Sequence, residues 1–164
     1  MPPAGILYRP KTDADRPFLA AVYASTRAAE LAMVPWTPAQ KAAFLDMQFN
    51  AQWQHYERFY PEAEFLVIEQ DGQPIGRLYI DRGPEEIGLV DIALIPAARG
   101  GGLGTRILRE ILDEARATGK GVAIHVERFN PALRLYQRLG FQPAGENGVY
   151  YLMRWSPASA TAVG

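Results

Sequence analysis

Residues 86–105 read EIGLVDIALIPAARGGGLGT, and this stretch decides the fold. Residues 87–95 are almost continuously apolar, which is typical of a strand covered on both faces of a sheet. A proline stops the strand, and four of the five residues 100–104 are glycine. An amphipathic pattern of period 3.6 then begins at Leu103. The stretch therefore predicts a buried strand, a glycine-rich turn and a helix.

The glycine-rich turn has the properties of an anion site. Glycine lets the backbone approach a ligand closely and allows positive φ. The first turn of the following helix offers unpaired N–H groups and a partial positive charge. Arg99 adds a permanent positive charge at the mouth. A plain strand-to-helix turn needs fewer glycines, so the turn predicts a pyrophosphate site.

Two common phosphate-binding loops do not fit the turn. A Walker loop places a lysine after its last glycine, and none follows Gly104. A dinucleotide fold places its glycines after the first strand, with an acid about 20 residues further on. Here the motif follows a late strand, so both readings are disfavoured.

The rest of the chain surrounds this unit with strands and helices in the order β-α-α-β-β-β-α-β-α-β. Thr37 is the expected cap of the second helix, and Asp13 or Asp15 that of the first. Asp71-Gly72 predicts a two-residue hairpin. The expected strands cover residues 6–9, 64–69, 74–80, 87–95, 122–126 and 148–155. Hairpins mixed with strand–helix–strand crossovers predict an α+β fold: a mixed, mostly antiparallel central sheet of about 6–7 strands, with about 4 helices on both faces.

Length and composition limit the organisation and the chemistry. A chain of 164 residues fits one domain, expected over residues 1–155, with a disordered tail over residues 156–164. The absence of cysteine excludes disulfides, thiolate zinc sites and a cysteine nucleophile. His55 and His125 lie far apart in the sequence, which disfavours a histidine-based metal site.

Charge and hydropathy predict neither a nucleic-acid partner nor a membrane partner. The net charge is −1 and the pI about 6.1, so no global basic field is present. The N-terminus lacks the pattern of a signal peptide. No apolar run approaches the ~20 residues that span a bilayer. We therefore expect a cytoplasmic protein.

Two motifs resemble the GNAT (GCN5-related N-acetyltransferase) superfamily. Residues 99–104, RGGGLG, resemble its signature R/Q-x-x-G-x-G/A, and residues 130–141, NPALRLYQRLGF, resemble its second signature. Both occur in order within residues 86–141, and the element order agrees with the family. The resemblance implies that coenzyme A lies in a cleft where two neighbouring strands splay apart.

The resemblance also assigns residues to coenzyme A. It implies that backbone amides of the turn hold the pyrophosphate and that the central strand pairs with the pantetheine arm as an added strand would. Asn130 would bond the pantetheine, and Tyr136 would lie near the sulfur. The residues assigned to the coenzyme are Ala93, Leu94, Ile95, Arg99, Gly100, Gly101, Gly102, Leu103, Gly104, Thr105, Asn130, Leu133 and Tyr136.

The implied reaction is aminolysis of a thioester, which needs a neutral amine, a stabilised oxyanion and a leaving thiol. A backbone N–H near Leu94 can bind the oxyanion. Tyr136 can protonate the departing thiolate, or it can simply fill space between Leu135 and Leu139. No nucleophilic side chain is required.

Three residues are candidates for the base. His125 has the residue type that titrates near neutrality, and otherwise it is a hydrogen-bonded sheet residue. Asp91 is an acid inside an apolar strand, so it is either paired for structure or catalytic. Glu86 begins the same strand, and otherwise it is an exposed strand end. Family members often bulge in this strand, so the alternation of faces does not choose among them.

The expected function is transfer of an acetyl or other acyl group from acetyl-CoA to a primary amine, by direct attack in a ternary complex and without a metal. The acceptor is a small-molecule amine or a peptide. Aromatic residues of the second helix, such as Trp53 and Tyr56, pack in the core or line an acceptor pocket. One alternative is a GNAT-like module that binds acyl-CoA as a sensor without catalysis, and another is an ATP-dependent phosphotransferase. The family resemblance also allows a homodimer.

Overall fold

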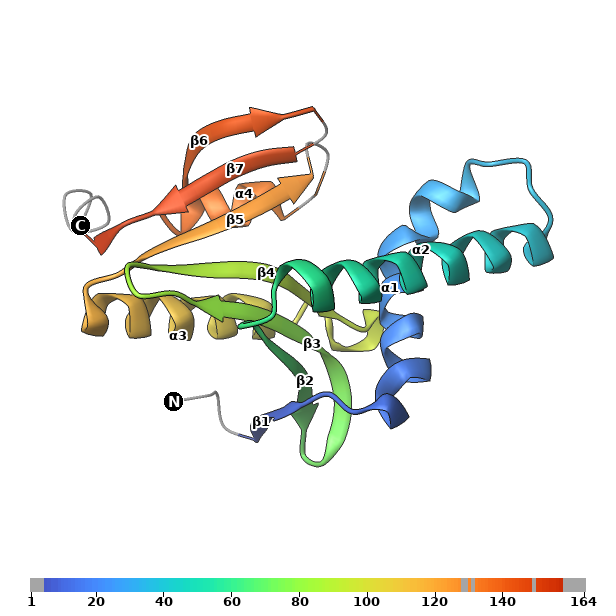
Figure 1. The fold of residues 1–164 in the computed structure, drawn as a ribbon, viewed down its shortest axis with the longest axis horizontal. Helices are drawn as coiled ribbons and strands as arrows, with labels where there is room; N and C mark the ends of the chain where they lie inside the picture. Colours follow the sequence, from blue (N-terminus) through green and yellow to red (C-terminus); the bar gives the residue numbers. More distant parts are fainter. Residues whose placement is uncertain (1–4, 128–129, 131, 149, 158–164) are drawn as a thin grey trace.

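The computed structural model describes residues 5–127, 130, 132–148 and 150–157. Seven strands form one sheet in the order β1-β2-β3-β4-β5-β7-β6 (Figure 1). The strands are β1 (Ile6–Pro10), β2 (Glu64–Gln70), β3 (Gln73–Arg82), β4 (Glu86–Leu94), β5 (Gly121–Glu127), β6 (Gln142–Asn147) and β7 (Tyr150–Trp155). Only β4 and β5 pair in parallel among the described neighbours. The predicted mixed, mostly antiparallel sheet is confirmed.

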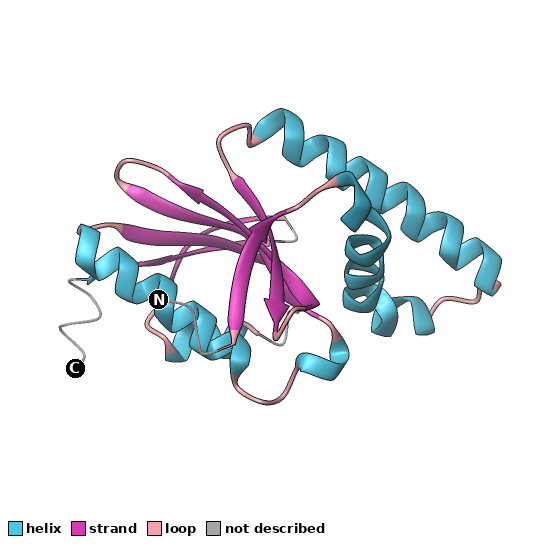
Figure 2. Ribbon diagram, turned by 90° about the horizontal axis from the view of Figure 1, so that it is seen from below, coloured by secondary structure: helices cyan, strands magenta, loops and turns pink. Residues whose placement is uncertain are grey.

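Helices cover both faces of the sheet (Figure 2). The α-helices are α1 (Arg16–Ala32), α2 (Pro38–Phe59), α3 (Leu103–Thr118) and α4 (Leu133–Arg138), and short 3-10 turns cover Asp13–Asp15 and Pro96–Ala98. Side chains of α3 and α4 join the larger core, whereas α1, α2 and β2 share a second, smaller cluster. The sheet therefore separates an α3/α4 face from an α1/α2 face.

The helix start and the hairpin that were predicted from local sequence signals are both present in the structure. The Thr37 side chain accepts a hydrogen bond from the Gln40 amide, in a capping box that begins α2. Asp71 and Gly72 both have positive φ, 51° and 84°, as a type I′ hairpin turn requires. The hairpin thus fixes the register of β2 against β3.

Strand β6 is a correction to the predicted order, which has one strand after the last helix where the structure has two. Its residues lack apolar alternation and include Pro143 and Gly145. Among the strands that the structure describes, β6 pairs with β7 alone, and its register shifts between Pro143 and Gly145. Proline and a bulge are tolerated at a sheet edge, where no second partner needs the backbone groups. An edge strand of this kind leaves little signal in the sequence.

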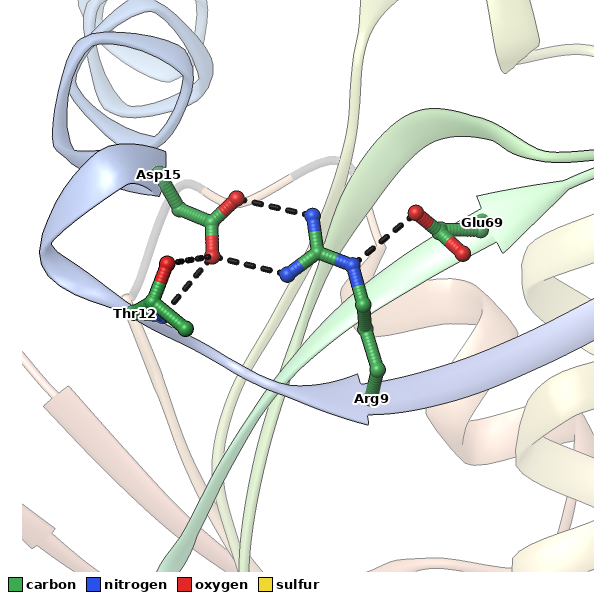
Figure 3. A network of polar contacts seen from close by, with 4 residues as sticks. All are labelled: Arg9, Thr12, Asp15 and Glu69. Carbon is green, nitrogen blue, oxygen red and sulfur yellow. Dashed lines mark hydrogen bonds and ion pairs between the residues drawn. The ribbon is translucent and has the colours of Figure 1, made fainter.

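A polar network fixes the junction between β1 and α1 (Figure 3). Arg9 donates to both carboxylate oxygens of Asp15, each at 2.8 Å, and to Glu69 on β2 at 2.9 Å. The Thr12 amide and hydroxyl donate to the same carboxylate. The guanidinium of Arg9 holds the pKa of Asp15 well below its usual range. Asp15 stands at the start of α1, as predicted, and its carboxylate ties the helix to the sheet.

The predicted tail falls largely outside the described residues, which end at Pro157. The boundary of the domain at residue 155 therefore stays a prediction.

Candidate functional site

The two parallel strands separate along their length, which opens the sheet. β4 and β5 pair from Glu86 opposite Gly121 to Leu89 opposite Ile124. Beyond this point β4 continues to Leu94 and β5 to Glu127, and no described residue of one pairs with the other. Figure 1 shows the two arms of the sheet diverging here. A free strand edge inside a sheet is a place where an extended ligand can pair with the backbone.

A bulge in β4 sets which face each side chain of this opening takes. Tyr79 lies opposite Asp91, while the next residue of β3 lies opposite Leu89, so Val90 is the extra residue. Leu89 and Leu94 belong to the α3/α4 core. Strict alternation from Leu89 would place Asp91 in that core, whereas the bulge moves it to the α1/α2 face. The bulge therefore removes a carboxylate from the apolar interior.

Asp91 pairs with a buried arginine on the neighbouring strand. Arg77 of β3 forms an ion pair with its Oδ2 atom. The Arg77 side chain is 3% exposed and the Asp91 side chain 21%. The Arg77 guanidinium lies 5.2 Å from the Tyr79 ring and 5.9 Å from the Tyr23 ring. Arg77 was not among the residues predicted from the sequence, where its signal is a lone charge in the expected apolar strand 74–80.

The charge of Asp91 reaches two tyrosines on different helices. Burial, and then the charge of Asp91, raise the pKa of Tyr136 on α4 to about 12. The same two causes raise the pKa of Tyr56 on α2. Tyr136 is 5% exposed, and its ring packs edge-on against Phe141. The Tyr136 hydroxyl is therefore protonated at neutral pH, as a proton donor must be.

The glycine-rich turn leads into α3 at the open end of β4. Gly100 and Gly102 have positive φ, 86° and 80°. A Cβ atom added at Gly100, Gly101 or Gly102 would meet no described atom within 4 Å. The first intrahelical bond runs from the Arg106 amide to the Gly102 carbonyl, so the preceding amides have no partner within the helix. The turn can therefore present amides to an anion.

Arg99 turns back toward the protein. Its Nε donates to the Leu94 carbonyl at 2.9 Å, and its terminal nitrogen donates to the Ser25 hydroxyl of α1 at 3.0 Å. These bonds tie the end of β4 and the glycine-rich turn to α1. The arginine thus braces the turn, in addition to adding charge there.

Some backbone N–H and C=O groups at the end of β4 have hydrogen-bond partners within the protein, and others face the opening. The Ile95 amide donates to Ile75 on β3, and the Ile95 carbonyl accepts from Ala98. Successive residues of a strand point their backbone groups to opposite sides, so the amides of Ala93 and Ile95 face β3 and that of Leu94 faces the opening. Among Ala93, Leu94 and Ile95, which were assigned to the pantetheine arm, Leu94 is therefore the residue whose N–H can bind a ligand in the opening.

Two further residues assigned to coenzyme A lie at the start of α4. The Asn130 side-chain oxygen accepts from the Ala132 amide at 2.8 Å, and the Asn130 carbonyl accepts from the Leu133 amide at 3.0 Å. Leu133 is half-buried against the α3/α4 core. Asn130 therefore holds the turn that delivers Tyr136 to the opening.

The structure separates the candidate bases. His125 is exposed on β5, one residue beyond the last β4–β5 pair, and faces away from the buried Ile124 and Val126. Glu86 lies at the joined end of β4, in an ion pair with Arg154 at 3.1 Å. Asp91 and His125 thus border the opening, and Glu86 does not.

Aromatic residues of α2 divide between two environments. Phe49 and Trp53 are buried in the smaller cluster with α1. Phe59 is exposed, and Tyr56 packs edge-on against Tyr79 at 5.4 Å between ring centroids. Phe49 and Trp53 therefore pack in the core, while the charge of Asp91 contributes to the raised pKa of Tyr56.

No described helix is long and apolar enough to cross a membrane. Within the described ranges, no group of three or more His, Cys, Asp or Glu side chains is arranged to hold a metal ion.

The family comparison matches the opening and the turn to known proteins. The acetyltransferase (GNAT) family model matches residues 26–141, well over half of the chain. The chain belongs to the GNAT acetyltransferase family. Membership gives the enzyme class, acetyl-CoA-dependent N-acyl transfer, and confirms the resemblance seen in the two motifs.

Relatives of this GNAT chain include acetyltransferases named for α-amino groups. A Bacillus subtilis (strain 168) relative, named for N-acetylation of an alanine of ribosomal protein bS18, is 34% identical over 94 residues, 56% of this chain and 62% of that protein. N-alpha-acetyltransferase RimI of Mycobacterium tuberculosis (strain H37Rv) is 34% identical over 122 residues, 71% of this chain and 68% of that protein. The chain thus spans about two thirds of each relative's length.

A solved structure supports the fold. The PaiA N-acetyltransferase of Thermoplasma acidophilum, solved in complex with coenzyme A, has a TM-score of 0.68 to this GNAT chain at 16% identity, covering 92% of this chain and 98% of that one. At this identity the likeness concerns the fold alone, and it confirms the predicted fold class.

Proposed function

We propose that the protein acetylates a primary amine by direct attack on acetyl-CoA in a ternary complex. The observation that carries this proposal is the opening between β4 and β5, which has Asp91 on one face, Tyr136 on the other and the glycine-rich turn at its end. These groups supply an amine site, a proton donor and an anion site. No covalent intermediate on the protein is needed.

Coenzyme A pairs with the free edge of β4. Its pyrophosphate sits on the amides of the glycine-rich turn and the first turn of α3, where the helix dipole favours an anion. The pantetheine arm follows β4 toward Asp91, and the thioester carbonyl accepts from the Leu94 amide. Asn130 and Leu133 lie at the facing side of the arm.

The acceptor amine approaches from the α1/α2 face. Its ammonium form binds the carboxylate of Asp91, and a proton passes through water to His125 or to solvent. The neutral nitrogen attacks the thioester carbon and forms a C–N bond. The tetrahedral intermediate then breaks its C–S bond, and the sulfur takes a proton from Tyr136. The protonated nitrogen gives its second proton to water as the amide forms, and the Tyr136 phenolate takes a proton back from water.

The acceptor class follows from the amine site and from the relatives. Two relatives are named for α-amino acceptors, one of them an alanine. We therefore take a peptide with an N-terminal alanine as the first acceptor, with a polyamine as the comparison.

Coenzyme A release tests the proposal. The full chain is incubated with acetyl-CoA and either the alanine peptide or the polyamine, and free thiol is measured together with the mass of the amine. We expect thiol release that depends on the amine and an acetylated product. If acetyl-CoA raises the melting midpoint and no amine in a broad panel releases thiol, the protein is a binding module and the proposal is wrong. A ligand at 100 times its Kd stabilises by about 2.7 kcal/mol, which the midpoint can detect.

A further inference from the structure

We propose that Arg77 is a positioning residue for acceptor binding, acting through Asp91. This inference rests on the proposed function, because it requires Asp91 to bind the acceptor amine. Arg77 lies on β3, next to the opening but not on either strand that borders it. Arg77 therefore influences the reaction indirectly, through its ion pair with the Asp91 carboxylate.

The first argument is the asymmetry of the ion pair. Arg77 is 3% exposed, while Asp91 keeps 21% of its side chain exposed. The arginine contacts Oδ2 of Asp91 from the protein side. A carboxylate has two oxygens and about four acceptor sites, so one partner leaves acceptor capacity for an amine on the exposed side. In this ion pair Arg77 is thus enclosed by the protein, and the exposed part of Asp91 is available at the opening.

The second argument is how firmly the guanidinium is held. Rings of Tyr79 and Tyr23 lie beside it, from β3 and α1, at 5.2 and 5.9 Å. Burial raises the pKa of Tyr79 to about 12. A guanidinium packed against rings has a fixed plane, which fixes the direction of its N–H groups. Arg77 therefore sets where the carboxylate of Asp91 stands.

Burying the Arg77 guanidinium costs free energy of folding. The Arg77 Nε is buried and has no hydrogen-bond partner among the described residues. Buried ion pairs stabilise little on balance, and apolar residues of similar size often replace them without loss of stability. A buried charge with an unsatisfied N–H is thus a poor device for stability alone. Orientation of Asp91 gives it a role that an apolar pair would not fill.

The bulge at Val90 makes the pairing possible. Without the extra residue, Asp91 would point to the α3/α4 core, away from Arg77. The bulge and Arg77 therefore both position the Asp91 side chain. The bulge determines the face of the sheet on which Asp91 lies, and Arg77 orients its carboxylate on that face.

Steady-state kinetics of five variants test the inference, with acetyl-CoA and the alanine peptide as substrates. The variants are Arg77→Met, Arg77→Lys, Asp91→Asn, the double variant Arg77→Met/Asp91→Asn and the control Arg82→Met. Arg82 lies on the same strand but forms surface ion pairs with Glu64 and Glu114. For each variant kcat/KM of the peptide, KM of acetyl-CoA and the melting midpoint are measured.

We expect Arg77→Met to lower kcat/KM of the peptide about 10- to 100-fold, as a displaced catalytic geometry does. KM of acetyl-CoA should change less than about twofold, since β4 and the turn are untouched. Arg77→Lys keeps the charge but not the planar fork, so it should recover part of the loss. Arg82→Met should match the parent protein within about twofold.

The double variant separates positioning from a general structural role. If Arg77 acts through Asp91, Arg77→Met lowers kcat/KM less than about twofold further once Asp91 is already Asn. If the full loss persists in the Asp91→Asn background, Arg77 acts by another route and the inference is wrong. The double variant also leaves no unpaired buried charge, so it remains a folded test if Arg77→Met alone fails to fold.

The same variants distinguish this inference from the proposed function. An unchanged kcat/KM in Asp91→Asn shows that Asp91 does not bind the amine, and the inference and that step of the proposed function then both fall. Impaired Asp91→Asn with unimpaired Arg77→Met overturns the inference alone. Absence of any acetylation by the parent protein overturns both.

Discussion

The two ends of β4 have different surroundings. At its start, Glu86 pairs across a continuous sheet and reaches Arg154 in an exposed ion pair. At its other end the strand leaves β5, bulges, and places Asp91 beside a buried arginine. Each end carries one carboxylate and one arginine, so composition does not separate them. The difference lies in whether β5 is paired with β4, because both strands continue beyond their last pair.

This contrast teaches that the site is made by an interruption of pairing. The joined end satisfies its backbone groups within the sheet, whereas the open end leaves a free edge. Surface ion pairs contribute about 0–1 kcal/mol, so the Glu86 pair has little energetic role. The four predictions below ask whether activity and stability divide between the two ends as the geometry does.

The largest effect is expected for Tyr136→Phe, on the far side of the opening. Removing the proton donor should lower kcat about 100-fold, the low end of general acid catalysis, while Kd for acetyl-CoA stays within about twofold. Stopped-assay turnover and calorimetric binding measure the two quantities. Tyr60→Phe, at the end of α2, is the matched control. Equal turnover in the parent protein and in Tyr136→Phe would show that Tyr136 is not the proton donor.

A smaller effect is expected for Gly102→Ala in the turn. Gly102 has a φ of 80°, so an alanine there costs about 1–2 kcal/mol. The melting midpoint without ligand should fall by about 2–4 °C per kcal/mol. Gly101→Ala is the control, because Gly101 is not among the positive-φ glycines. A similar loss in both variants would show that space, rather than conformation, limits the turn.

A gradual effect is expected at high pH. Tyr79 and Tyr136 have pKa values raised from 10.0 to about 12, and burial also raises the pKa of Tyr56. Each tyrosine stays neutral in the folded protein after it ionises in the unfolded chain. Their contribution is therefore complete below pH 10 and is lost as the pH rises toward 12. Melting midpoints across this range should fall, and less steeply in Tyr79→Phe than in the parent protein.

The smallest effect is expected for Glu86→Gln at the joined end. We expect kcat/KM for the acceptor to stay within about twofold and stability to change by less than about 1 kcal/mol. A loss as large as that of Asp91→Asn would mean that the joined end takes part in the reaction, and the comparison of the two ends would no longer hold.

The sequence predicted the parts of the fold that depend on neighbours along the chain. The apolar run of β4, the glycines and the 3.6 period of α3 are local signals, and so is the Asp71-Gly72 hairpin. The second signature predicted the position of Tyr136 on α4. These features lie on the side of the opening where the proposal places coenzyme A.

The proposed acceptor side depends on pairing between strands, which the sequence does not display. The face of Asp91 follows from a bulge at Val90, and a bulge is visible only against the register of β3. Arg77 becomes its partner only in that register. The edge strand β6 was missed because it buries no alternating apolar side. Arg99 was expected to add charge at the mouth of the turn, and its hydrogen bonds to Leu94 and Ser25 depend on contacts between distant parts of the chain.

Both borders of the sheet contain a proline: Pro10 closes β1, and Pro143 lies in β6 beside a register shift. A flat, unpaired border with free N–H groups is a template on which another chain can add a strand and begin aggregation. Proline offers no such group, and a bulge bends the border away from a flat partner. If coenzyme A pairs with the free edge of β4, as proposed, the outer edges of the sheet must still be kept from pairing with other chains, and each of the two outer strands includes a proline. We expect contact between copies of this chain to use its helical faces.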